Sequence, residues 1–80
     1  GSTMEIGENL KFIESAEDVI HLELKGEKEY LVILFNAGNE KEMDLPITAG
    51  KIELTSNSNT TLRYNKLRLP KQSMVVLKAE

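Results

Sequence analysis

Apolar and polar side chains alternate along most of this chain, and this pattern limits what the chain can fold into. Ile20, Leu22 and Leu24 alternate with polar residues, and Leu67 and Leu69 flank an arginine. A period of two is typical of β-strands that have one buried and one solvated face. No window long enough for a helix keeps a helical period without an interrupting Gly or Pro. The pattern therefore predicts an all-β fold.

Turn-forming clusters rich in Gly, Asn and Pro interrupt the alternation at short, fairly even intervals. They lie at residues 25–28, 36–39, 46–50, 56–59, 65–66 and 70–71. Gly and Asn tolerate a positive φ, and Pro fixes φ while removing a hydrogen-bond donor, so these clusters indicate chain reversals. Short strands at this spacing favour a small antiparallel two-sheet β-sandwich of about seven or eight strands, with Greek-key connections.

The length of the chain leaves room for a single domain. Among its 80 residues, Gly1 to Thr3 resemble a cloning scar ahead of Met4, and we expect residues 4–80 to form one β-sandwich domain. The absence of cysteine excludes disulfides and thiolate metal sites, and we expect no cofactor. The sequence is compatible with either a cytoplasmic or a secreted bacterial protein.

The charge pattern argues against nucleic acid and membranes as partners. Ten Lys and Arg residues stand against 13 Asp and Glu, which gives a net charge of −3, and the basic residues are dispersed. Binding to nucleic acid or to anionic lipid requires clustered positive charge. The longest apolar run, 30–35, is far shorter than the ~20 residues that span a bilayer.

Two segments are apolar at consecutive positions and so depart from the alternation. They are residues 30–35 and 74–77. A strand that is apolar on both sides is expected where both faces of its sheet are covered, whereas a two-layer sandwich covers one face of each sheet. Either Leu31, Ile33 and Phe35 or the residues alternating with them would face outward. Burial of each such side chain is worth ~1.5–3 kcal/mol, so we expect a docking surface there.

The docking face that we expect consists of apolar residues from both of these segments. Its members are Leu31, Ile33, Phe35, Val75 and Leu77. Three covers are open at this point: a loop of the chain itself, a second copy or a neighbouring domain. In an isolated chain, the same face could form a dimer.

Four segments in order resemble a known family. An apolar strand at 30–36 ends in Asn, a polar turn and Met43 to Pro46 follow, then Lys51 to Asn57, and finally Leu67 to Leu77 with an internal Leu-Pro. This set resembles the C-terminal β-sandwich of α-amylase-family glycoside hydrolases of the α-glucosidase, cyclomaltodextrinase and maltogenic amylase type. The opening segment at 7–13 and residues 19–25 also fit, so the resemblance covers the chain from about Gly7 onward.

The resemblance implies a non-catalytic role. In that family the catalytic carboxylates belong to the barrel domain, so none of them corresponds to a residue of this chain. The chain would then be an accessory domain that packs on and stabilises a catalytic barrel, and the parent protein would be a glycoside hydrolase that acts on α-glucan. The partner that the resemblance implies is therefore the catalytic barrel of the parent chain.

The residues offer no convincing catalytic or metal site. Glycoside hydrolysis needs two carboxylates about 5–9.5 Å apart, and Glu40, Glu42 and Asp44 alternate along one segment. We interpret them as a charged strand edge that discourages association with other strands. The single histidine, His21, occupies a polar position in an alternating strand, and we expect it to be solvated. One His without Cys makes a zinc site improbable.

Two alternative functions remain open. A small carbohydrate-binding module would use an exposed aromatic ring to stack on a sugar. Of the four aromatic residues, Phe12 fits the core and Tyr64 is the candidate for exposure, with Asn57 and Asn59 in a nearby loop as hydrogen-bonding partners. The other alternative is an immunoglobulin-like interaction domain without any connection to sugars.

Overall fold

The structure is a computed structural model that describes residues 3–5, 9–45 and 49–79. Its strands are β1 (Thr3–Glu5), β2 (Leu10–Ile13), β3 (Val19–Lys25), β4 (Tyr30–Asn36), β5 (Lys41–Asp44), β6 (Ala49–Thr55), β7 (Thr61–Arg63), β8 (Lys66–Leu69) and β9 (Ser73–Ala79). The all-β prediction is confirmed. The strands from β2 onward give the expected number, and the short β1 adds one more. The described residues include no helix that could cross a bilayer.

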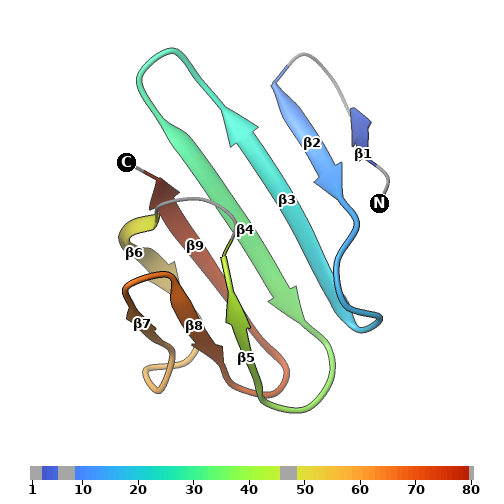
Figure 1. Ribbon diagram of the computed structural model, residues 1–80, viewed down its shortest axis with the longest axis vertical. Coiled ribbons are helices and arrows are strands. Elements are labelled where there is room, and N and C mark those ends of the chain that lie inside the picture. The colour runs from blue at the N-terminus through green and yellow to red at the C-terminus, as the bar shows by residue number, and fades with distance from the viewer. Residues whose placement is uncertain (1–2, 6–8, 46–48, 80) are drawn as a thin grey trace.

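The strands form two antiparallel sheets. The larger sheet has the order β1-β2-β3-β4-β9-β6, and the smaller sheet has the order β5-β8-β7. The last strand returns to lie between β4 and β6, so strands far apart in sequence are neighbours, as Greek-key connections require. In Figure 1 the smaller sheet lies on the β4–β9–β6 side of the larger one, and β1 to β3 extend beyond it.

The hydrophobic core lies between the two sheets. It consists of side chains from β4 and β9 of the larger sheet and β8 of the smaller sheet, joined by one residue of β3 and one that follows β5. Its members are Val19, Val32, Leu34, Leu45, Leu67, Leu69, Val75 and Leu77. Six of them, all except Val19 and Leu45, have no exposed surface. The side of the larger sheet that faces this core is called the inner face below, and the opposite side the outer face.

The first strands of the larger sheet present their apolar side chains to the outer face, contrary to expectation. His21 pairs with the core residue Leu34 and is itself buried, whereas Ile20 and Leu24 are exposed. Phe12, expected in the core, is also exposed. The predictions for His21 and Phe12 were therefore wrong. A period of two fixes which residues share a face, but the pairing with β4 decides which face meets the core.

An irregularity in β6 places Ile52 and Leu54 on opposite faces of the sheet, although simple alternation predicts that they share one face. Ile52 pairs with the buried Leu77, but the register shifts before the next pair, in which Leu54 lies opposite Val76. One extra residue in a strand turns the following side chains to the other face. Ile52 consequently packs against the core, while Leu54 is 60% exposed on the outer face.

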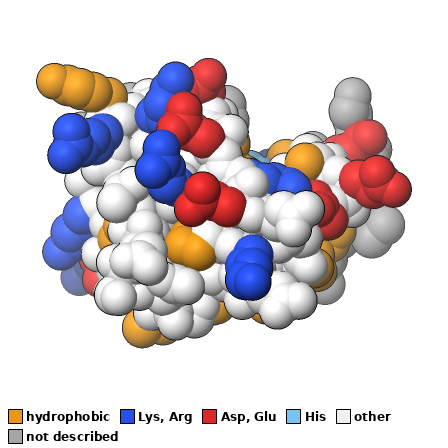
Figure 2. All heavy atoms as spheres, turned by 90° about the horizontal axis from the view of Figure 1, so that it is seen from below, with side chains coloured by type: hydrophobic (Ala, Val, Ile, Leu, Met, Phe, Trp, Pro, Cys, Tyr) orange, Lys and Arg blue, Asp and Glu red, His pale blue; other side chains and the backbone are white. Residues whose placement is uncertain are grey.

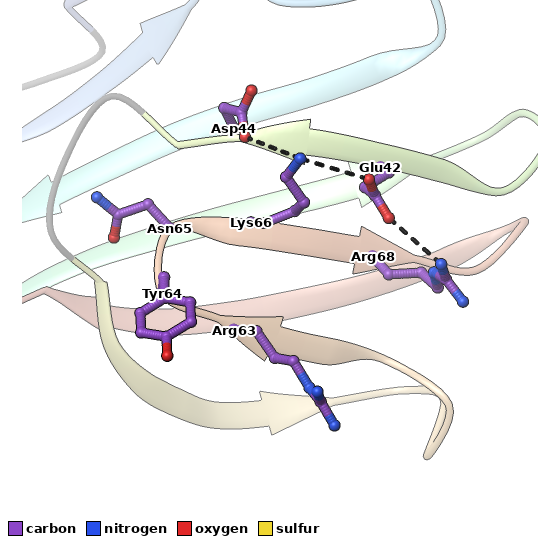
Figure 3. Close-up of a pocket in the computed structure, with 7 residues that line it drawn as sticks. All are labelled: Glu42, Asp44, Arg63, Tyr64, Asn65, Lys66 and Arg68. Carbon is purple, nitrogen blue, oxygen red and sulfur yellow. Dashed lines mark hydrogen bonds and ion pairs between the residues drawn. The ribbon is translucent and has the colours of Figure 1, made fainter.

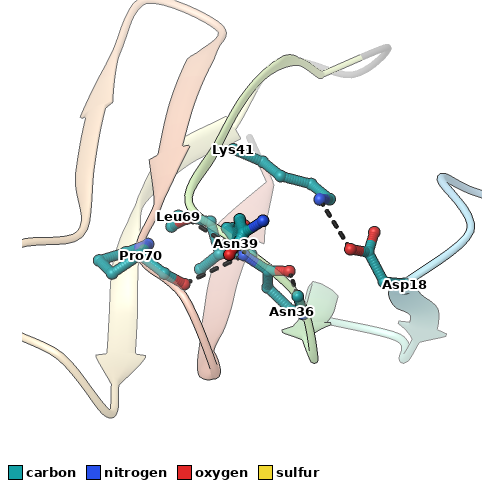
Figure 4. A network of polar contacts seen from close by, with 7 residues as sticks. Asp18, Asn36, Asn39, Lys41, Leu69 and Pro70 are labelled. Atoms are coloured by element: carbon teal, nitrogen blue, oxygen red, sulfur yellow. Dashed lines mark hydrogen bonds and ion pairs between the residues drawn. The ribbon is translucent and has the colours of Figure 1, made fainter.

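A buried asparagine connects the end of β4 to the turn between β8 and β9 (Figure 4). Asn36 has no exposed surface, and its Nδ2 donates to the carbonyl oxygens of Asn39 at 2.7 Å, Pro70 at 3.1 Å and Leu69 at 3.3 Å. Its Oδ1 accepts a hydrogen bond from the backbone N–H of Gly38 at 2.9 Å. Because buried polar groups must be paired, this network fixes how β4 meets the smaller sheet.

An ion pair at the same corner links the β2–β3 connection to β5. Lys41 Nζ lies 2.9 Å from Asp18 Oδ2, and this partner lowers the pKa of the Asp18 carboxyl. A Cβ atom added at Gly38 would overlap the Asp18 carboxylate, so a glycine is needed at this close approach. The ion pair therefore has room only because residue 38 lacks a side chain.

Candidate docking surface and neighbouring polar sites

The outer face of the larger sheet is a continuous apolar surface. Cross-strand pairing places apolar residues opposite one another from β2 through β3, β4 and β9 to β6. The apolar residues of the outer face are Leu10, Phe12, Ile20, Leu22, Leu24, Leu31, Ile33, Phe35, Leu54, Met74 and Val76, and Lys51 and Lys78 lie on the same side at one end. Residues directly opposite in a sheet project to the same side and contact each other.

This outer face lacks a protein cover among the described strands, all of which belong to the larger sheet itself or to the sheet on its inner side. Phe35, near the end of the central strand β4, is 43% exposed, and Ile20 beside it is 44% exposed. In the end view of Figure 2, hydrophobic side chains are visible at the lower margin and also in the centre and at the upper left, where many acidic and basic side chains lie. A contiguous exposed apolar surface is typical of an interaction site.

The structure places three of the five residues of the expected docking face on the outer face and the other two in the core. Leu31, Ile33 and Phe35 all belong to the outer face. Val75 and Leu77 do not, because both are fully buried in the core. Their neighbours Met74 and Val76 occupy the outer positions of β9 instead. The sequence offered no signal for this choice, since all four residues are apolar and only the pairing with β4 separates them.

Tyr64 lies at the tip of the turn between β7 and β8 and is 97% exposed, as expected. It borders a shallow depression of about 340 Å³ on the smaller sheet (Figure 3). The remaining lining residues are charged or polar and come from β5, β7, β8 and the turn: Glu42, Asp44, Arg63, Asn65, Lys66 and Arg68. Charge patterning along these strands could have drawn attention to this cluster, but only the β5–β8 pairing brings its members together.

Asn57 and Asn59 lie apart from this depression. They belong to the loop that enters β7, whereas Tyr64 follows the end of the same strand. Asn57 stabilises the turn to which it belongs. Its Oδ1 accepts a hydrogen bond from the N–H of Asn59 at 2.8 Å, and its carbonyl accepts one from the N–H of Thr60 at 3.1 Å. The structure therefore does not bring these two asparagines together with Tyr64 in one site.

The acidic residues considered for catalysis lie along and beside an edge strand. β5 is the first strand of the smaller sheet and carries Glu42 and Asp44, while Glu40 immediately precedes it. Both acids of β5 lie near cations: Glu42 contacts Arg68 at 3.3 Å, and Asp44 contacts Lys66 at 3.8 Å. In the part of the chain that the structure describes, no group of three or more His, Asp or Glu residues is arranged to hold a metal ion.

A partly buried polar cluster lies on the inner face of β3 and β4. His21 Nε2 lies 3.1 Å from Glu23 Oε2, and the Tyr30 hydroxyl donates a hydrogen bond to the other oxygen of the same carboxylate. Burial and the Glu23 carboxylate raise the pKa of Tyr30 to about 12. Burial lowers the pKa of His21, and this effect outweighs Glu23, which acts in the opposite direction. His21 is therefore a neutral, packed residue rather than a solvated one.

The depressed pKa of His21 predicts a loss of stability in mild acid. Because the folded state holds its proton less tightly than the unfolded chain, whose histidine has a pKa of about 6.5, the contribution of neutral His21 falls as the pH drops below that value. We expect the urea midpoint of unfolding to decrease between about pH 7 and about pH 5. In His21→Gln this decrease should be smaller. An equal decrease in both proteins would contradict the assignment.

Comparisons with known proteins provide no family for this chain. A scan against protein-family models finds no match, and a search of curated proteins finds no similar sequence at a significant level. Inference about its function therefore rests on the outer face, the polar sites and the resemblance described above.

Proposed function

We propose that this chain is a non-catalytic accessory domain that packs through its outer face on a catalytic barrel, as the C-terminal sandwich of α-amylase-family glycoside hydrolases does. The observation that carries the proposal is the exposed apolar face of the larger sheet. Five of its residues are at least about one-third exposed: Phe12, Ile20, Leu24, Phe35 and Leu54. An 80-residue domain gains nothing from leaving such residues in water.

The size of this face suits a stable interface. It spans five adjacent strands, β2 through β4, β9 and β6, and it carries aromatic side chains on two of them. Covering each exposed apolar side chain contributes a fraction of the ~1.5–3 kcal/mol that full burial provides. Charged residues on this side lie toward one end of the sheet, where Lys78 pairs with Leu31 and Lys51 pairs with Lys78. The partner should therefore present an apolar patch.

The other features of the chain fit a structural role better than a catalytic one. The segments that carry the resemblance include Asn36, Leu69, Pro70 and Ser73, and these residues meet in the buried network at the end of β4. Ser73 Oγ donates to the Pro70 carbonyl at 2.6 Å, and this carbonyl also accepts from Asn36. The polar groups of these residues are engaged in hydrogen bonds that connect the two sheets, so they are not available for reaction with a substrate.

The state of association of the isolated chain tests the docking surface. We expect sedimentation velocity to show reversible, concentration-dependent association, because the outer face would otherwise remain in water. Phe35→Glu should abolish this association, since it places a charge within the apolar face, between Ile20 and Met74. Thr61→Glu is the matched control, because Thr61 is exposed on the smaller sheet, and it should leave association unchanged. A strict monomer in the unmodified chain, up to millimolar concentration, would contradict the docking proposal.

The identity of the partner needs a separate test. We expect the coding region that precedes this segment in its genome to encode a glycoside hydrolase barrel. In the joined protein, Phe35→Glu should lower the thermal midpoint of the barrel, whereas Thr61→Glu should not. An upstream region without such a barrel would overturn the proposed partner but would leave the docking surface standing.

A further inference from the structure

The smaller sheet covers only part of the larger one and leaves an open step along β5. A three-stranded sheet faces a six-stranded one, and in Figure 1 β2 and β3 continue beyond β5. In the end view of Figure 2, this region is a hollow along the upper margin, with hydrophobic side chains visible in it. Among the described strands, β5 pairs with β8 alone. Its other edge is therefore open to pairing with a strand of another chain.

The backbone groups of two acidic residues point toward this open edge. The N–H of Leu45 donates to the carbonyl of Asn65 at 2.8 Å, on the side of β8. Because the backbone groups of successive residues in a strand point to opposite sides, those of Glu42 and Asp44 point away from β8. The open edge thus offers N–H donors and carbonyl acceptors at the spacing that a neighbouring strand requires.

A cavity of about 310 Å³ lies at the step, between β5, β3 and the end of β2. Its lining includes the imidazole of His21, and the remaining lining residues are polar apart from five: Ile13, Ala16, Leu34, Met43 and Leu45. A strand added at about 4.8 Å from β5 would lie over β3. Its side chains next to Met43 and Leu45 would then face the cavity, because neighbouring residues of paired strands project to the same side.

The solvent side of β5 is acidic. Glu42 and Asp44 alternate with Met43, which packs against the core, so their side chains project to the opposite side of the strand. They are 47% and 84% exposed, although Lys66 and Arg68 contact them from β8. Side chains of an added strand opposite these acids would be favoured when basic and disfavoured when acidic. A second copy of β5 would place acids beside acids, so another copy of this edge is a poor occupant.

From these features, we propose that an extended segment of a partner protein, in which basic and apolar residues alternate, pairs as an additional strand with the open edge of β5. Its basic side chains would lie opposite Glu42 and Asp44, and its apolar side chains would enter the cavity beside Met43. Backbone hydrogen bonds to an edge strand provide affinity in such complexes, while side chains at alternate positions provide specificity. This edge lies on the inner side of the larger sheet, so the inference does not depend on the outer face.

Titration of the 80-residue chain with the peptide acetyl-Lys-Val-Lys-Leu-Lys-Val-amide, observed by two-dimensional amide NMR, tests this edge. We expect saturable shifts in residues 41–45, 13–16 and 21, with a dissociation constant near about 0.5 mM. A peptide of the same composition in the order Lys-Lys-Lys-Val-Leu-Val lacks the alternation and should bind about tenfold more weakly. A version with glutamate in place of lysine should not bind.

The proposal is overturned if the alternating peptide produces no saturable shifts at about 5 mM. It is also overturned if the block peptide or the acidic peptide binds as tightly as the alternating one, because neither provides basic and apolar side chains on opposite sides of a strand.

Asp44→Pro separates backbone pairing from folding. The N–H that proline removes points to the open edge, so the hydrogen bonds between β5 and β8 remain. Peptide binding should weaken at least about tenfold, with little change in the thermal midpoint. Asp44→Asn keeps that N–H and should weaken binding only about threefold.

Ala16→Trp provides a second test that leaves β5 unaltered. Ala16 is exposed and lines the cavity, so a larger side chain should block the cavity and weaken peptide binding without disturbing the core. Phe35→Glu on the outer face is the control and should leave peptide binding unchanged, so the two surfaces are tested separately. If Asp44→Pro or Ala16→Trp folds and binds the peptide as tightly as the unmodified chain, the edge of β5 is not the binding site.

Discussion

Replacement of Asn36 by alanine is expected to lower the free energy of unfolding by about 3 kcal/mol, because buried polar groups would lose their partners. The side chain is fully buried and takes part in four hydrogen bonds that link β4 to the turns after it and after β8. Alanine would leave the N–H of Gly38 and the carbonyl of Leu69 without these partners. In a domain of this size, the thermal midpoint should fall by about 15 °C.

Urea denaturation followed by far-UV circular dichroism measures this effect, and Asn39 provides a matched control. Asn39 is exposed and contributes to the network through its backbone carbonyl, so Asn39→Ala should cost less than about 0.5 kcal/mol. Asn36→Asp should be strongly destabilising at neutral pH, because it turns a carboxylate toward three carbonyl oxygens. Equal losses in Asn36→Ala and Asn39→Ala would contradict the network.

The second large effect is expected at Leu34, on the strand that is apolar on both faces. Leu34→Ala should destabilise the domain by about 3 kcal/mol, because it leaves a cavity among fully buried side chains of both sheets. Leu34 has no exposed surface and pairs across the sheet with Val75. The loss should appear as a lower urea midpoint with little change in the slope of the transition.

Leu31 is the matched control for Leu34, since it is the same residue type on the same strand. It belongs to the outer face, opposite Leu24 and Lys78, and is only partly buried. Leu31→Ala should cost about 1 kcal/mol or less, because little enclosed space is created. Leu31→Ala should also weaken the association of the isolated chain. The folded form of Leu34→Ala should associate as strongly as the unmodified chain. Comparable stability losses at the two positions would mean that the outer face is covered.

The apolar character of 30–35 pointed to a surface in need of a partner, and the arrangement of the strands is consistent with that interpretation. Leu31, Ile33 and Phe35 occupy the outer face because Val32 and Leu34 are taken up by the core. The equivalent choice on β9 could not be made from sequence. Residues 74–77 are apolar without interruption, so either alternating set could have faced the smaller sheet.

Polar positions were the hardest to interpret from sequence alone. His21 looked like a solvated residue because its neighbours alternate with it, yet its pairing with Leu34 turns it inward, where Glu23 provides a partner. The cluster beside Tyr64 likewise depends on contacts between β5 and β8, which lie more than twenty residues apart. Local pattern carries no information about such contacts, because they depend on which strands become neighbours.

The amino-acid sequence by itself determined that this chain forms strands and turns, because alternation and turn residues act over a few positions. It also determined that β4 would be apolar on both sides. Only the tertiary structure decided which alternating set faces the core, where the bulge in β6 reverses Leu54, and which distant polar groups meet. These choices follow from strand pairing across the sheets, where a shift of one residue exchanges the two faces.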